Sequence, residues 1–197
     1  MPDRIVNFYF AFNSPYSFLA DSRIERELAP FNLELRAKPV YSPRTGGAPD
    51  PNSPKLRYLS EDVRRFADAY GLKLNPGPFA DSRNACIGFL FAQDRGVGAA
   101  YRHAVFAARF LEAGNIGDQE VLAQVAEKCE LKRGDFTAAL QDRRYQDALD
   151  SINKEAAADG AFGIPFFVID GKKFWGNDRI EWLIRELQKS LASSSKG

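Results

Sequence analysis

Two adjacent segments decide the fold class of this protein: Ile5-Val6-Asn7-Phe8-Tyr9-Phe10 and Asn13-Ser14-Pro15-Tyr16-Ser17. The first is rich in β-branched and aromatic residues, which is typical of a buried β-strand. In the second, Ser14 is a good helix N-cap, and Pro15 suits the first helical position because its missing backbone N–H needs no partner there. The two segments therefore predict a strand followed directly by a helix that extends to about Leu28.

A second strand and a long helical region follow this first unit. Alternating apolar and polar residues predict a strand over 33–40. The segment 41–54 holds four prolines and two glycines, so it is predicted to be a loop. Apolar side chains then recur at helical spacing from residue 55 to about 157. The predicted helices are 55–70, 83–94, 99–112 and 118–129, then a short one capped by Asp135 and a longer one capped by Asp142.

Strand patterns return after Gly160. Residues 165–169 predict a strand, Asp170-Gly171 a hairpin turn, and residues 172–175 the partner strand. A last helix is predicted over 178–191, and the Ser-rich segment 192–197 is expected to be flexible.

The predicted order is βαβ, then helices, then ββα, which defines an α/β protein. Neither end of the chain has enough strands to form a stable sheet alone, so both are expected to share one thioredoxin-like sheet. Residues 1–42 and 144–191 would form this thioredoxin-like domain, and residues 43–143 would be a large all-helical insertion.

Composition excludes several kinds of chemistry. The chain has 27 Lys and Arg against 26 Asp and Glu. Proteins that bind nucleic acids usually carry an excess of basic residues, so we expect no nucleic-acid partner. The two cysteines, Cys86 and Cys129, form no C-x-x-C motif, and the one histidine, His103, lies close to neither in sequence. A disulfide framework, a metal site and a dithiol redox motif are therefore not expected.

The sequence shows neither a membrane-span pattern nor a signal-peptide pattern. No segment approaches the ~20 consecutive apolar residues of a membrane span. The N-terminus lacks the basic and apolar regions of a signal peptide, and unpatterned cysteines fit a reducing compartment. We therefore expect no membrane association and a cytoplasmic location.

Ser14 and Ser17 stand at the spacing of the two thiols of a C-x-x-C motif, where a strand leads into a helix. The free N–H groups and the dipole of a helix start favour anions, and in dithiol enzymes they lower the pKa of a cysteine. Serine cannot form a disulfide, but its hydroxyl could donate a hydrogen bond to a thiolate that belongs to a ligand. Alternatively Ser14 only caps the helix, and the residues alone leave both interpretations open.

The Ile164-Pro165 pair at the start of a predicted strand is a second candidate. A cis peptide bond at this place would expose the backbone of Ile164 to a peptide-like ligand. Base rates favour an ordinary trans proline, because only about 5–6% of X-Pro bonds in folded proteins are cis.

Charged residues supply the remaining candidates. Asn177, Asp178 and Arg179 precede the last helix, where they could cap it or bind the α-amino-carboxylate of a ligand. Lys55 and Asp62 share one face of a predicted helix. That face is either solvated or turned toward a charged ligand.

Together these segments resemble the 2-hydroxychromene-2-carboxylate isomerases, which group with the kappa-class glutathione transferases in the DsbA-like branch of the thioredoxin folds. The resemblance rests on the order and spacing of four segments, which are 8–20, 55–67, 161–165 and 174–179. It extends over nearly the whole chain, apart from the proline-rich loop and the C-terminal tail.

For the thiol end of glutathione, the resemblance implies three residues. Ser14 would be the catalytic residue beside the glutathione sulfur. Ile164, ahead of a cis Pro165, would pair its backbone with the cysteinyl unit.

For the two ends of glutathione, the resemblance implies five more residues. The γ-glutamyl end would be held by Asp178 and Arg179, with Asn177 beside them. The glycyl carboxylate would face Lys55, with Asp62 nearby.

The implied activity is the glutathione-dependent cis–trans isomerisation of 2-hydroxychromene-2-carboxylate to trans-o-hydroxybenzylidenepyruvate, a step in aromatic compound catabolism. The thiolate would add to the conjugated system, allow rotation about the resulting single bond and leave again. The implied partners are glutathione, a small aromatic substrate and a second copy of the chain in a homodimer.

Two departures from the family pattern leave the substrate open. Relatives often have an acidic residue at the position of Ala11, and many have an Asn-Pro-Pro-like contact where this chain reads Gly46-Gly47-Ala48-Pro49-Asp50-Pro51. One alternative is a kappa-like glutathione transferase that acts on another electrophile. Another is a non-catalytic thioredoxin-like module that binds glutathione or a peptide.

Overall fold

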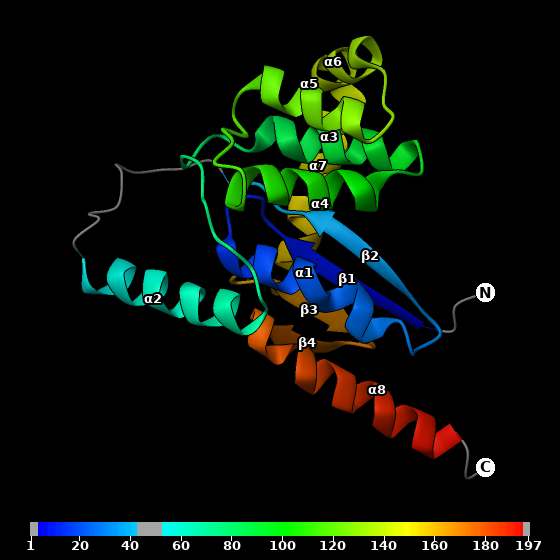
Figure 1. Ribbon diagram of the computed structural model, residues 1–197. Coiled ribbons are helices and arrows are strands. Elements are labelled where there is room, and N and C mark those ends of the chain that lie inside the picture. Colours follow the sequence, from blue (N-terminus) through cyan, green and yellow to red (C-terminus); the bar gives the residue numbers. More distant parts are fainter. Residues whose placement is uncertain (1–3, 43–52, 195–197) are drawn as a thin grey trace. The chain divides into compact units, whose positions relative to one another are not determined.

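One mixed sheet organises the ends of the chain in the computed structural model, which describes residues 4–42 and 53–194. The strands are β1 (Arg4–Phe10), β2 (Leu33–Pro39), β3 (Phe166–Ile169) and β4 (Lys172–Trp175), in the order β2-β1-β3-β4 (Figure 1). β1 pairs in parallel with β2 and antiparallel with β3, which pairs antiparallel with β4. The predicted thioredoxin-like sheet is therefore confirmed.

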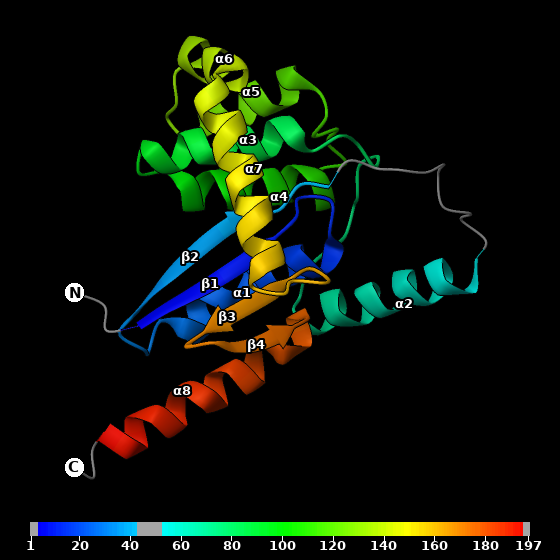
Figure 2. The ribbon, with the colours of Figure 1, turned by 180° about the vertical axis from the view of Figure 1, so that it is seen from behind.

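The two faces of the sheet follow from the alternation of residues along β1. Val6, Phe8 and Phe10 are fully buried on the face covered by α1 (Pro15–Leu28), and the ring of Phe8 stacks on Phe167 with centroids 5.0 Å apart (Figure 1). Tyr9 points to the opposite face, where it packs with Ala156 of the last helix before β3 (Figure 2). This packing buries both faces near the middle of the sheet.

The chain divides into two compact units, one formed by residues up to Val40 and from Asp150 onward, the other by residues from Tyr41 to Leu149. The second unit is helical. Its helices are α2 (Pro54–Ala69), α3 (Arg83–Asp94), α4 (Gly98–Phe110), α5 (Gln119–Lys128), α6 (Arg133–Gln141) and the first part of α7 (Arg143–Ala158). The division falls after Leu149, inside the continuous helix α7, whereas the predicted domain boundary lay after Arg143, the first residue of that helix.

One of the two predicted caps in this region is wrong. Helix α6 begins at Arg133 with Lys132 as its N-cap, and Asp135 lies in the first turn instead of capping it. The N-cap position and the first helical turn both favour a carboxylate, because the helix start carries a partial positive charge. The sequence pattern alone therefore does not distinguish a capping aspartate from one in the first turn. The other prediction is confirmed, since Asp142 Oδ1 accepts the N–H of Arg144 at 2.8 Å at the start of α7.

The end of the chain also differs from the prediction. A 3₁₀ turn, η1 (Asn177–Arg179), precedes α8 (Ile180–Ser194), so the α-helix starts later than residue 178 and continues past Leu191. Extending an existing helix fixes one residue per hydrogen bond, and Ala192 is a good helix former, so the serines do not stop it at once. The proline-rich segment 43–52 and residues 195–197 lie outside the described residues.

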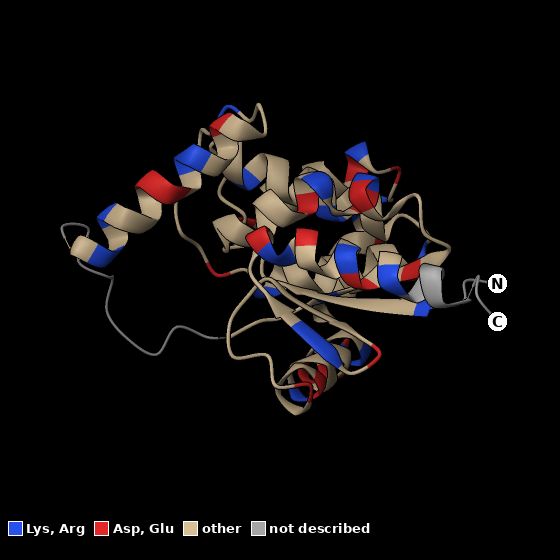
Figure 3. Ribbon diagram, turned by 90° about the horizontal axis from the view of Figure 1, so that it is seen from below, with Lys and Arg blue, Asp and Glu red and all other residues tan. Residues whose placement is uncertain are grey.

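Charges of both signs are interspersed along the described helices (Figure 3). Among residues 4–42 and 53–194, no helix combines the length and the apolar character needed to cross a bilayer.

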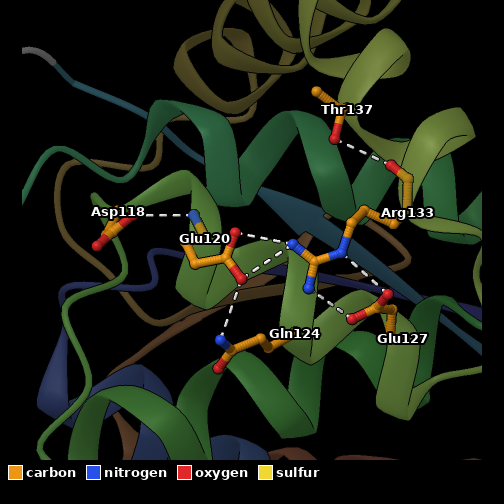
Figure 4. A network of polar contacts seen from close by, with 6 residues as sticks. All are labelled: Asp118, Glu120, Gln124, Glu127, Arg133 and Thr137. Carbon is orange, nitrogen blue, oxygen red and sulfur yellow. Dashed lines mark hydrogen bonds and ion pairs between the residues drawn. The ribbon is translucent and has the colours of Figure 1, made fainter.

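Arg133 joins α5 to α6 through a bidentate ion pair with Glu127 and a second ion pair in which one nitrogen donates to both oxygens of Glu120 (Figure 4). Its NH1 atom lies 2.7 Å from Glu120 Oε2, and its NH2 atom lies 2.7 Å from Glu127 Oε2. Gln124 Nε2 donates a further hydrogen bond to Glu120 Oε1 at 3.1 Å. Hydrogen bonds from Arg133 hold the pKa of the Glu120 and Glu127 carboxyls below the ordinary glutamate value.

The helical unit is expected to lose stability in acid through this network. The pKa of Glu120 and of Glu127 is lowered in the folded chain, so the stabilisation is complete above the ordinary glutamate pKa and is lost as the pH falls through the lowered values. Urea unfolding over a series of pH values measures this loss, and Arg133→Gln should flatten it. Arg143→Gln, which removes an exposed 3.8 Å pair with Asp147, is the control and should leave the profile unchanged. Parallel profiles for Arg133→Gln and the wild type would contradict the prediction.

Candidate functional site

Ser14 is held at the start of α1 as the sequence predicts. Its Oγ accepts the N–H of Ser17 at 3.1 Å, and Pro15 follows as the first helical residue. The N–H of Ser14 donates to the carbonyl of Ala11 at 2.9 Å, which closes the turn after β1. The hydroxyl of Ser14 is therefore an acceptor for the helix start, while its own hydrogen remains available to another group.

In this structure, the hydroxyl hydrogen of Ser14 is directed to the backbone carbonyl of Ile164. The Ser14 hydroxyl donates to the Ile164 carbonyl over 3.4 Å, at the long end of hydrogen-bond range. The Ile164-Pro165 peptide bond is cis, so the expectation from base rates is wrong and the one from the family resemblance is confirmed. Two segments at opposite ends of the sequence thus meet at the start of α1.

Ser17 has a different role from Ser14, which sequence reasoning did not separate. Ser17 is fully buried, and its Oγ accepts the N–H of Ala11 at 3.2 Å. It therefore satisfies the backbone of the β1–α1 turn from inside the protein. Of the two hydroxyls at thiol positions, only that of Ser14 lies beside Ile164.

The charged residues before α8 are tied to the same place by one backbone hydrogen bond. The N–H of Gly176 donates to the carbonyl of Pro165 at 3.0 Å, which sets η1 directly beside the cis peptide. Asn177 is buried, whereas Asp178 and Arg179 are partly exposed and form an ion pair of 3.0 Å. A carboxylate and a guanidinium therefore lie side by side close to Pro165.

Gly176 is the one residue in this turn that needs to be glycine. Its φ is +112°, a conformation that L-residues rarely adopt, and an added Cβ would lie 2.5 Å from Asp178 Oδ1. The missing side chain thus leaves the space in which the Asp178 carboxylate lies.

Lys55 and Asp62 both lie on α2, in the helical unit. Ser53 caps this helix, with its Oγ accepting the N–H of Leu56 at 3.3 Å. Lys55 is exposed, and Asp62 Oδ1 lies 3.7 Å from Arg65 NH1. That Lys55 and Asp62 belong to one glutathione site with Ser14 stays a prediction.

An open pocket of about 570 Å³ lies between β4 and α8 and is lined by Lys173, Phe174, Trp175, Arg179 and Trp182. Trp175 is 52% exposed, and its ring lies 4.8 Å from that of Phe162, which is 75% exposed. Sequence reasoning included Trp175 in a family motif but assigned no role to it. Exposed aromatic residues beside a cation are suited to flat, anionic ligands.

Neither cysteine is suited to be a nucleophile. Cys86 and Cys129 are free and buried, and burial raises the pKa of both thiols. Because only the thiolate is reactive, both are structural residues of the helical unit. Within the described part of the chain, no three His, Cys, Asp or Glu side chains gather as metal ligands would.

A hydroxyl at the start of the first helix, opposite a cis-proline at the start of an antiparallel strand, defines a thioredoxin-like protein without the dithiol. The family model of DsbA-like thioredoxin domains matches residues 5–188 of the chain. The relatives narrow this class further. A 2-hydroxychromene-2-carboxylate isomerase of Pseudomonas putida is 33% identical over 184 residues, which cover 89% of this chain and 90% of the relative.

Solved structures agree with this relationship. A 2-hydroxychromene-2-carboxylate isomerase matches with a TM-score of 0.85 and 27% identity over 98% of both chains. The cytosolic disulfide reductase DsbM of Pseudomonas aeruginosa, solved with GSH, shares the fold at a TM-score of 0.71 and 17% identity, over 98% of this chain and all of DsbM. The chain therefore belongs to the 2-hydroxychromene-2-carboxylate isomerase family within the DsbA-like thioredoxin proteins, as its motifs predict.

Proposed function

We propose that this protein is a glutathione-dependent isomerase that converts 2-hydroxychromene-2-carboxylate to trans-o-hydroxybenzylidenepyruvate. The named relatives support isomerase chemistry. The observation that carries the glutathione dependence is the Ser14 hydroxyl, held at a helix start 3.4 Å from the carbonyl of Ile164. The GSH in the DsbM structure supports the same ligand for this fold.

The residues around Ser14 fit a thiolate. Ser14 Oγ already accepts the Ser17 N–H, so its hydrogen is the one it can give to a ligand. The competing bond to Ile164 is long and therefore weak, and breaking it costs little. A hydroxyl donor and the positive end of α1 would together hold the pKa of a bound thiol low enough for a thiolate to form.

The backbone and the charged pair fit the rest of the molecule. The Ile164 carbonyl, once released by Ser14, would accept an amide N–H of glutathione. Asp178 would bind the ammonium group and Arg179 the carboxylate of the γ-glutamyl end, beside Asn177 and Pro165. We propose Lys55 and Asp62 for the glycyl end, and a homodimer as the assembly.

When bound, glutathione supplies a nucleophile that adds reversibly to the conjugated double bond, so that this bond becomes single and can rotate. The residues of the chain contribute position and charge. Ser14 donates its hydrogen to the sulfur and takes no proton away. No net redox change occurs, in agreement with the absence of a second thiol at Ser17.

The test is a comparison of turnover with and without glutathione. Isomerisation of the chromene acid only when glutathione is present would support the proposal. Conjugation of a general electrophile without isomerisation would favour the kappa-like transferase, and glutathione binding without turnover would favour the binding module. Isomerisation at the same rate without glutathione would contradict the proposed mechanism.

Gly176→Ala is expected to lower both the affinity for glutathione and the stability. The positive φ costs about 1–3 kcal/mol for a non-glycine residue, and the Cβ would push Asp178 away from its present place. We expect a loss of glutathione affinity of about tenfold, measured by calorimetric titration, as for a lost hydrogen bond to a charged group.

Gly171→Ala is the matched control for this variant. Gly171 also has a positive φ, of +75°, but an added Cβ would have no neighbour within 4 Å. It should lower the free energy of unfolding and leave glutathione affinity unchanged. Equal affinity losses in the two variants would show that the effect does not act through Asp178.

A further inference from the structure

A partly buried hydrogen bond joins the middle of the sheet to the segment that carries Ile164. The hydroxyl of Tyr9 on β1 donates to Asp159 Oδ2 at 2.6 Å, and Tyr9 is fully buried. Burial and the Asp159 carboxylate raise the pKa of the Tyr9 phenol. The phenol therefore keeps its proton and stays a donor to a charged acceptor, which is the stronger type of hydrogen bond.

Asp159 occupies the first position after α7, where the segment 159–165 begins. Its own N–H donates to the carbonyl of Glu155 at 2.8 Å, in continuation of the helix. Ala161 is anchored by a backbone hydrogen bond of 2.8 Å to Ala156, and Pro165 by one of 3.0 Å from Gly176. Between these anchors, Ile164 receives a hydrogen bond from Ser14 and packs against the cluster that contains Tyr9.

The Tyr9 ring supplies the apolar part of that support. Tyr9 forms a buried cluster with Ala156 and Phe166, and the side chains of Ala161 and Ile164 pack against this cluster. The cluster that contains the Tyr9 ring thus contacts the segment, and the Tyr9 hydroxyl holds the beginning of the segment.

A charged pair covers this arrangement. Lys38 Nζ lies 5.5 Å from the centre of the Tyr9 ring and 2.5 Å from Glu155 Oε1. Glu155 lies one helical turn before Asp159. The charged groups that face the Tyr9 hydroxyl are therefore Asp159, Glu155 and Lys38, contributed by the end of α7 and by β2.

We propose that Tyr9 and Asp159 are positioning residues that hold the segment 159–165 so that the Ile164 carbonyl can receive the ligand. In the free protein the segment is held at its start by Tyr9 and near its end by the Ser14–Ile164 hydrogen bond. A ligand that takes the Ser14 hydrogen removes the second bond, so the positioning then depends on the Tyr9–Asp159 bond together with the backbone hydrogen bonds of Ala161 and Pro165. This inference rests on the proposed use of glutathione.

Tyr9→Phe tests the inference because it keeps the ring and removes only the hydroxyl. The KM for glutathione should rise about tenfold, and kcat should change less than about twofold. The lost Tyr9–Asp159 hydrogen bond positions the binding segment, and neither residue contacts the reacting atoms. Asp159→Ala should raise the KM in the same direction but by no more than Tyr9→Phe does, because Glu155 also interacts with the Tyr9 hydroxyl. Asp159→Asn, whose amide oxygen still accepts a hydrogen bond from Tyr9, should restore most of the affinity.

Tyr101→Phe is the matched control. Tyr101 is the other fully buried tyrosine among the described residues, and its hydroxyl has no hydrogen-bond partner there. Its removal should leave the KM for glutathione unchanged. The double variant Tyr9→Phe with Asp159→Ala should be no worse than Tyr9→Phe alone, because Tyr9→Phe already removes the bond to Asp159.

Hydrogen exchange of the backbone amides of residues 160–164 provides a readout that needs no ligand. It should be faster in Tyr9→Phe than in the wild type and unchanged in Tyr101→Phe. Unchanged exchange, or an unchanged KM in a folded Tyr9→Phe variant, would overturn the inference, and so would equal effects of Tyr9→Phe and Tyr101→Phe. A wild type that does not use glutathione would refute the proposed function instead, and exchange would still decide whether Tyr9 holds the segment.

Discussion

Replacing Ser14 by alanine is expected to lower isomerase turnover by about 10²-fold or more while the chain stays folded. The variant removes the hydroxyl at the start of α1 that we propose as the donor to the glutathione thiolate. Loss of a single preorganised donor to a developing or resident anion costs about 10²–10³ in rate in well-studied enzymes. The pKa of bound glutathione, followed by the ultraviolet absorbance of the thiolate, should rise in parallel.

The loss of the helix cap has to be separated from the loss of the donor. Removing a serine cap costs about 1 kcal/mol of unfolding free energy, which Ser14→Ala should show in urea denaturation. Asp118→Ala is the control, because Asp118 caps α5 by accepting the N–H of Glu120 at 2.8 Å in the helical unit. It should lose a similar amount of stability and keep its turnover. Full turnover in Ser14→Ala would refute the mechanism.

Phe8→Ala should cause the largest loss of stability, about 3–5 kcal/mol. Phe8 is fully buried in the middle of β1, with its ring 5.0 Å from that of Phe167 and 5.5 Å from that of Phe10. Truncation would remove this stacking and leave a cavity between the sheet and the helices that cover it. Urea unfolding followed by circular dichroism measures the change.

The exposed end of the same strand provides the comparison. Ile5 is 37% exposed on β1, so Ile5→Ala should cost less than about 1.5 kcal/mol. If Phe8→Ala prevents folding altogether, Phe8→Leu keeps more of the volume and should fall between the two. Equal losses in the Phe8 and Ile5 variants would contradict the assignment of the core.

Local interactions explain why most of the fold could be predicted. A strand followed by Ser14-Pro15 contains its own turn and cap, and Asp142 caps α7 through a bond that spans two residues. Asp135 shows the limit of such reasoning, because several positions in the first helical turn favour a carboxylate equally. The extension of α8 past Leu191 is similar, since serine at a helix end neither requires nor forbids a stop.

The sequence indicated which residues of the sheet unit lie close together, whereas their roles in a site stay predictions. The motif order indicated Ser14, Ile164, Asp178 and Arg179, and the structure places Ser14 with Ile164 and η1 beside Pro165. The difference between Ser14 and Ser17 depends on which hydroxyl faces inward, which the S-x-x-S spacing does not contain. Lys55 and Asp62 remain predictions from the family resemblance.

By itself the sequence determined the order of strands and helices, the replacement of both thiols by serine, and the family. These depend on periodicity, caps and motif spacing, all of which act over a few residues. Only the tertiary structure decided that Tyr9 reaches Asp159 and that Ser14 reaches Ile164, both across 150 residues of chain. Such contacts come from the antiparallel pairing of β1 with β3. No local sequence pattern specifies which distant segments pair in this way.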